Sequence, residues 1–138
     1  MLSSCGGPAE APAKPDPTQQ PRYQTMVGQV AMLAAEADEL MKQKKRDEAA
    51  ALISKGQPMI AELLAAPRPS VEAMQAVSDL DDLYGQMLVG NRHYGEARML
   101  FQKNVARWKN WKPVSEDTAR RLKQAEERVA ECDKNIGK

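Results

Sequence analysis

The chain carries few histidines and cysteines, side chains that often act in catalysis or bind metal ions. His93 is the only histidine, and no cysteine or carboxylate cluster stands beside it at the spacing of metal ligands. Cys132 falls on the apolar stripe of a predicted helix, which indicates a buried, inert thiol rather than a nucleophile. The sequence also lacks a paired nucleophile and base and a Gly-rich phosphate loop. We therefore expect no enzymatic activity, no metal and no cofactor.

Three closely spaced carboxylates, Asp79, Asp81 and Asp82, raise the question of calcium. An EF-hand loop starting at Asp79 would need glycine at position 84 and glutamate at position 90, where Tyr84 and Gly90 stand. The spacing instead predicts a solvated helix face that borders a groove.

Basic residues gather in the run Lys42-Gln43-Lys44-Lys45-Arg46. Cations are favoured at the C-terminus of a helix, so the run predicts a helix end and a turn. Over the whole chain 20 basic residues face 19 acidic ones, a net charge of +1. This balance does not favour nucleic acid as a partner.

The composition favours an all-α fold, because aromatic residues make up only 4% of the chain and good helix formers are abundant. Apolar residues recur at three- and four-residue spacing in five segments. Ser70 and Ser115 are predicted N-caps, and Gly56 with Pro58 should kink or briefly break the second helix. Short loops predict about five antiparallel helices. The predicted ranges are 23–44, 47–66, 71–90, 92–110 and 116–136.

The N-terminal region differs from the rest. Residues 1–22 are rich in proline and glycine and have no periodic apolar pattern, which predicts a disordered tail or linker before a helical domain at 23–138. No apolar run is long enough to cross a bilayer.

A spaced set of residues in the third and fourth segments has the pattern of a helical repeat. Tyr84, Gly85, Leu88, Tyr94, Ala97 and Phe101 resemble the tetratricopeptide (TPR) signature. In this pattern small Gly85 and Ala97 let two helices approach, while Tyr94 and Phe101 fill the space between helical hairpins. An upstream segment resembles a degenerate copy of this pattern, with Ala49 at the position that Ala97 has in the downstream copy. The two alanines lie 48 positions apart, whereas uninterrupted TPR arrays repeat every 34 residues. The resemblance implies two TPR-like hairpins plus a C-terminal capping helix.

The same resemblance implies a concave, mildly acidic surface made by the first helix of each hairpin. TPR proteins that grip C-terminal carboxylates use Lys and Asn in this groove, where this chain has Ala34 and Asp38, so that type of partner does not carry over. The residues expected to face the groove are Ala31, Ala34, Asp38, Met41, Asp79, Asp82, Gln86 and Val89.

Trp111 lies beside Lys109 and Lys112 at the end of the fourth predicted helix. Two interpretations stay open for it. It could anchor a partner, because tryptophan is a common interface anchor, or it could pack under the fifth helix.

The string Leu2-Ser3-Ser4-Cys5 resembles a bacterial lipobox, in which the cysteine receives a lipid. The basic and apolar regions of a signal peptide should precede it, but only Met1 does. Either the chain is a shortened or late-started lipoprotein precursor, or the match is chance.

Together these observations predict a non-enzymatic scaffold or adaptor that binds another protein or peptide, tethered to a bacterial cell-envelope membrane through Cys5 and facing the periplasm or exterior. The alternative is a free all-helical bundle, cytoplasmic if Cys5 carries no lipid, that self-associates. Exposure of Trp111 and Val89 in the monomer would favour the adaptor. Burial of these residues in a homodimer would favour the self-associating bundle. The identity of the partner does not follow from the sequence.

Overall fold

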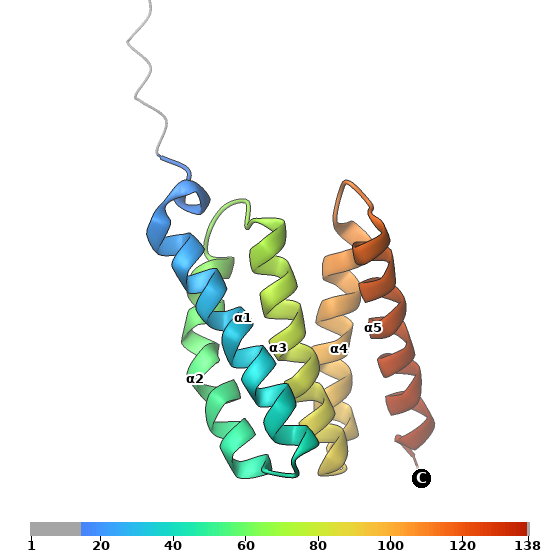
Figure 1. Cartoon of the computed structure of the whole chain (residues 1–138). Helices are drawn as coiled ribbons and strands as arrows, with labels where there is room; N and C mark the ends of the chain where they lie inside the picture. The colour runs from blue at the N-terminus through green and yellow to red at the C-terminus, as the bar shows by residue number, and fades with distance from the viewer. Residues whose placement is uncertain (1–14, 138) are drawn as a thin grey trace, which may run out of the picture.

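The computed structural model describes residues 15–137, which are helical almost throughout and include no strand (Figure 1). The all-helical class predicted from composition is confirmed. A short 3-10 helix, η1, precedes five α-helices. Their bounds are η1 Pro17–Gln19, α1 Pro21–Lys42, α2 Arg46–Leu64, α3 Val71–Gly90, α4 Tyr94–Asn110 and α5 Glu116–Asn135.

Both predicted N-caps are present. The Ser70 side chain accepts a hydrogen bond from the backbone N–H of Ala73 at 3.1 Å, which starts α3. Ser115 accepts one from the backbone N–H of Thr118 at 3.1 Å, and the Thr118 hydroxyl accepts one from the Ser115 N–H at 2.8 Å. This reciprocal capping box satisfies backbone donors that a helix start leaves without partners.

Two turns, between α1 and α2 and between α3 and α4, have the same backbone conformation. Lys44 and Arg92 occupy the left-handed region, with φ of 65° and 63°. The next residue in each turn donates its N–H to a carbonyl five residues back, Lys45 to Leu40 and His93 to Leu88, both at 2.8 Å. These are Schellman motifs, which close the carbonyl end of a helix.

Helix α2 runs through Pro58 without interruption, so the predicted break is not present. Pro58 lies on the exposed side of the helix. Gly56 is buried where α2 crosses α3, and a methyl group there would overlap the Leu80 side chain. The glycine therefore allows close packing between helices rather than breaking one.

The helical structure begins earlier than the predicted position, Tyr23. The Asp16 carboxylate accepts hydrogen bonds from the backbone N–H and the hydroxyl of Thr18, at 3.0 and 2.8 Å, and this cap starts η1. Tyr23 is buried and donates its hydroxyl to the Leu63 carbonyl at 3.1 Å. Residues 17–22, assigned to the tail from composition, thus belong to the helical structure.

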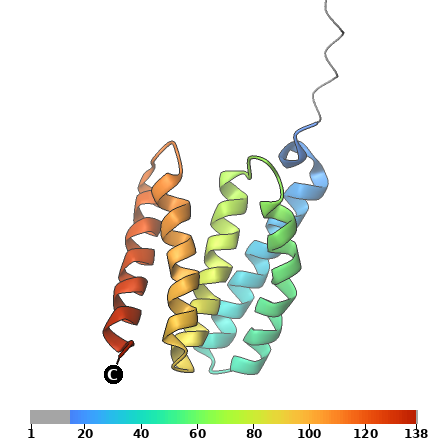
Figure 2. The same ribbon diagram turned by 180° about the vertical axis from the view of Figure 1, so that it is seen from behind.

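The core has two parts. The larger apolar cluster joins α1, α2 and α3, and the smaller one joins α3, α4 and α5. Helix α3 packs against α1, α2 and α4, while α5 packs mainly against α4 (Figure 2). No helix within residues 15–137 is both long and apolar enough to cross a membrane.

The smaller cluster shows what the Phe101 side chain contacts. Phe101, expected to fill the space between hairpins, packs directly against Gly85 of the neighbouring α3, where a methyl group would overlap its ring. Its cluster includes Cys132 of α5, which is fully buried as predicted. Tyr94, expected to fill the space between hairpins, is only half-buried.

Candidate functional site

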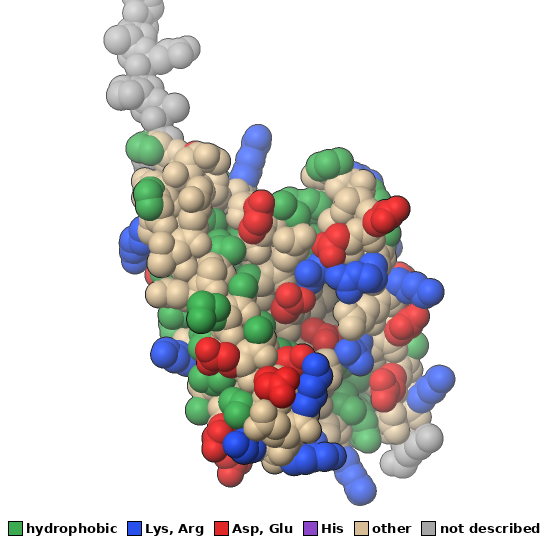
Figure 3. Space-filling model, viewed as in Figure 1, with side chains coloured by type: hydrophobic (Ala, Val, Ile, Leu, Met, Phe, Trp, Pro, Cys, Tyr) green, Lys and Arg blue, Asp and Glu red, His purple; other side chains and the backbone are tan. Residues whose placement is uncertain are grey.

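A groove runs along one face of the molecule between α1, α3 and α5 and has a cavity volume of about 480 Å³. In Figure 3 this face shows a hollow bordered by acidic and basic side chains. Small side chains of α1 line one side and long polar side chains of α5 the other. The lining residues are Ala31, Ala34, Ala35, Asp38 and Lys42 of α1, Asp79, Asp82, Leu83 and Gln86 of α3, and Arg120, Gln124 and Arg128 of α5.

Much of the predicted groove surface comes together here. Ala31, Ala34 and Asp38 on α1 line the groove, as do Asp79, Asp82 and Gln86 on α3.

Three predicted binding residues lie elsewhere. Met41 is half-buried and packs against the larger core cluster. Val89 is half-buried against the smaller cluster and lines a separate hollow of about 220 Å³. Trp111 lies in the loop between α4 and α5 and does not line the groove. The half-burial of Val89 and Trp111 does not decide between adaptor and self-associating bundle.

The groove is balanced in charge rather than mildly acidic. Its three carboxylates, on Asp38, Asp79 and Asp82, are matched by three cations, on Lys42, Arg120 and Arg128. The α5 wall was not predicted, because two TPR-like hairpins leave α5 only the role of a capping helix. The spacing of residues 120, 124 and 128, four apart, was the available signal, since residues four apart share one face of a helix.

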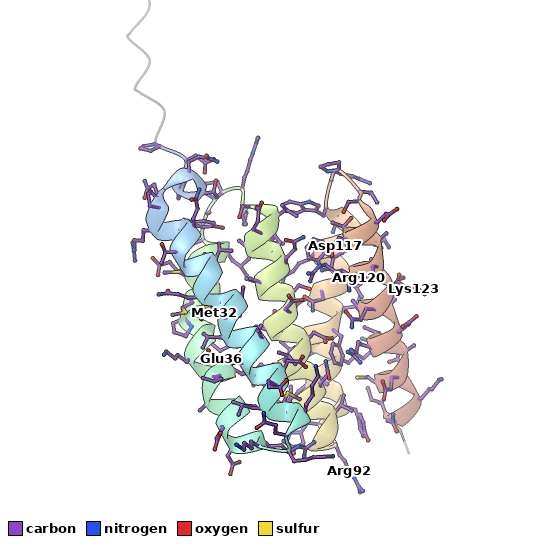
Figure 4. All side chains as sticks on the ribbon, viewed as in Figure 1. Met32, Glu36, Arg92, Asp117, Arg120 and Lys123 are labelled. Atoms are coloured by element: carbon purple, nitrogen blue, oxygen red, sulfur yellow. The ribbon has the colours of Figure 1, made fainter. Side chains whose placement is uncertain are left out.

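Polar side chains join α3 to α5 in what we call the charged seam. Gln75 donates to Asp117 at 2.9 Å, Arg121 pairs with Asp79 at 2.7 Å, and Arg128 pairs with Asp82 at 2.9 Å. Asp117 also pairs with Arg120 on its own helix at 2.7 Å; both residues are labelled in Figure 4. The seam fixes where the α5 wall of the groove stands relative to α3.

Asp81 contradicts the prediction of a solvated acidic face. Only 4% of its surface is exposed, and its carboxylate pairs with Arg107 of α4 at 2.7 Å. Asn104 donates to the Ser78 carbonyl at 3.1 Å and Trp108 donates its indole N–H to the Ser78 hydroxyl at 2.9 Å. A buried polar network therefore joins α3 to α4. We call it the α3–α4 polar network.

The two tryptophans lie together. Trp108 is buried, and the half-buried Trp111 meets it edge to face with ring centroids 6.2 Å apart. The Arg121 guanidinium lies 5.6 Å from the centroid of the Trp108 ring, within range of a cation–π contact. Trp111 therefore both packs in the structure and keeps part of its surface open.

Contacts within the charged seam shift the pKa of Asp117 and of Arg121. Burial alone would raise the pKa of Asp117, but hydrogen bonds from Arg120, Arg121 and Gln75 lower it to about 2. Burial opposes the charge of Arg121, yet its contacts with Asp79 and Asp117 raise its pKa. Both shifts favour the charged forms of Asp117 and Arg121.

The other candidate residues are less suited to chemistry. His93 is exposed at the start of α4, with its Nδ1 3.7 Å from a Glu96 carboxylate oxygen. Burial raises the pKa of the Cys132 thiol, which disfavours the thiolate. Within residues 15–137, no three or more His, Cys, Asp or Glu side chains are grouped to hold a metal ion. The predicted lipidation site, Cys5, lies outside the described residues.

Comparison with protein-family models, with curated proteins and with solved structures found no match for this chain.

Proposed function

We propose that this protein is a non-enzymatic scaffold or adaptor that holds a segment of another protein in the groove between α1, α3 and α5. The observation that carries the proposal is the groove itself, which gathers side chains from three helices and lies open to solvent. Exposed Ala31 and Ala35 leave room for a partner to approach α1 closely.

The proposal includes a TPR-like architecture of antiparallel hairpins. Three features support it: the matching turns at Lys44 and Arg92, which are 48 positions apart like Ala49 and Ala97, the contact of Gly85 with Phe101, and the burial of both alanines. In TPR-like architecture the first helix of each hairpin lines the concave surface, which is the role that α1 and α3 would have here, with α5 extending the same surface.

Site-specific photo-crosslinking tests the groove. A photoreactive phenylalanine analogue at position 31 or 35 should give a defined adduct with a partner protein in native cells. The same analogue at Ala51, an exposed residue of α2 outside the groove, serves as the matched control. A substitution Ala35→Trp, which fills the groove, should abolish the adduct formed from position 31. Equal adducts from all three positions, or none from the groove, would overturn the proposal.

We also propose a lipid anchor on Cys5 and a place at the cell-envelope membrane, supported by the sequence Leu2-Ser3-Ser4-Cys5. The measurement is the intact mass of the N-terminal peptide of protein made from its native gene. A diacylglycerol adduct on Cys5 is the expected result. An unmodified thiol would contradict the anchor and leave the groove proposal standing.

A further inference from the structure

One end of the molecule gathers cations from the two matching turns. Lys44, Lys45, Arg46 and Arg92 lie there, and we call them the basic end. In Figures 1 and 2 both turns are at the bottom, opposite η1 and the start of α1. Figure 4 labels Arg92 at this bottom end.

The four cations are exposed and make no ion pair with any of residues 15–137. Their neighbour Lys42, by contrast, pairs with Asp38 at 3.0 Å. The Arg46 guanidinium lies against Gly90, the last residue of α3, so the first turn reaches the second. The basic end is therefore one continuous surface whose charges are free to meet a partner.

The backbone supports a role for these cations beyond closing the turns. Lys44 and Arg92 hold φ near +65°, a conformation that costs free energy for every residue with a Cβ atom. Glycine is the usual residue at this position of a Schellman motif because it adopts the conformation without strain. Both turns carry a long cation there instead, although the helix dipole would be met equally well by a cation in the last helical turn.

Carboxylates also occur at this end. Asp47 and Glu48 lie in the first turn of α2 and Glu96 lies in the first turn of α4, where the positive end of a helix dipole favours them. Glu96 is the neighbour of His93. None of these carboxylates pairs with a cation of the basic end.

We propose that the basic end docks an acidic segment of a partner protein, bound by carboxylates that contact Lys44, Arg46 and Arg92. None of the exposed large hydrophobic side chains, Met32, Met99, Val114 and Ile136, lies in either turn, so the surface lacks the apolar residues of a membrane-inserting site. No exposed Phe, Tyr or Trp side chain lies in either turn for stacking on nucleic-acid bases; the exposed ring there is the His93 imidazole. This surface is separate from the groove, so the inference does not depend on the proposed function.

The test uses a fluorescein-labelled peptide of eight glutamates as the probe, titrated with the full chain at low salt. Lys44→Gly with Arg92→Gly removes two charges and relieves both strained positions. Lys103→Gln with Lys109→Gln removes two exposed, unpaired charges from α4 and serves as the matched control. The expected result is binding about fivefold weaker in the glycine variant, the size of two exposed ion pairs, and less than twofold weaker in the control. Thermal unfolding of the glycine variant should be unchanged or shifted upward.

Equal weakening in both variants would show that only net charge matters and would overturn the proposal. So would unaltered binding in the glycine variant, absence of binding by the native chain, or binding to vesicles of anionic phospholipid in preference to the peptide. Ala35→Trp, which fills the groove, should bind the probe like the native chain, so failure of the groove proposal and failure of this one are distinguishable.

Discussion

The interfaces on the two sides of α3 are built from different chemistry. On the side of α1 and α2, contacts are made by apolar residues such as Val30, Ile53 and Leu63. On the side of α4 and α5, the α3–α4 polar network and the charged seam accompany a smaller apolar cluster. The difference matters because apolar packing tolerates small changes in shape, whereas a buried polar group needs every partner in place.

The largest expected effect comes from breaking the buried pair on the polar side. Arg107→Met leaves the Asp81 carboxylate buried without its partner, and we expect a loss of about 3–5 kcal/mol in the free energy of unfolding. Ile53→Val, a small deletion on the apolar side, should cost only about 1 kcal/mol. Urea unfolding of both variants measures the difference.

The double variant Asp81→Leu with Arg107→Met tests the reason for that loss. If the cost arises from an unpaired buried charge, replacing both partners should recover most of the lost stability. A double variant as unstable as Arg107→Met alone would contradict this explanation.

Gly56 and Gly85, both buried, give the next effect. Gly85→Ala would drive a methyl group into the rigid Phe101 ring, with an expected cost of about 2 kcal/mol. Gly56→Ala meets the flexible end of Leu80, which can move, and alanine also favours the helix by up to about 1 kcal/mol. We expect Gly56→Ala to be close to neutral, as thermal unfolding of both variants would show. Equal destabilisation would mean that the two helix contacts are equally tight.

The apolar and polar sides of α3 also differ in how well the sequence predicted them. Apolar periodicity and capping residues predicted the five helices and the N-caps Ser70 and Ser115. The resemblance to TPR proteins implied much of the α1 and α3 surface of the groove. Asp81 was predicted to be solvated because its burial depends on Arg107, 26 positions later, and no periodic pattern reports such a pairing. The α5 wall was missed for a similar reason, since its position depends on long-range ion pairs such as Arg128 with Asp82.

The charged seam should respond to salt, which the apolar side should not. Asp82→Asn removes the charge that Arg128 contacts through two nitrogens, at 2.9 and 3.2 Å, and we expect a loss of about 1 kcal/mol at low salt. In 1 M NaCl the difference from the native chain should shrink, because exposed charges are screened. Asp38→Asn, which breaks the exposed pair with Lys42, should cost less than about 0.5 kcal/mol. Chemical unfolding at both salt concentrations measures these differences, and a salt-independent cost of Asp82→Asn would contradict an electrostatic role.

The pH response of Asp117 tests the charge of the seam directly. Its pKa falls from the ordinary value of 3.8 to about 2 in the folded chain, so folding favours the ionised carboxylate. This stabilisation is fully present above the unfolded pKa and is lost as the pH falls through the folded value. Asp117→Asn should therefore lower the unfolding temperature at pH 7, and the gap from the native chain should close between about pH 4 and pH 2. Calorimetry across this range gives the comparison, and subtracting the variant removes the titration of other carboxylates. A gap that persists at pH 2 would mean that Asp117 supports the seam through its shape and neutral hydrogen bonds rather than through its charge.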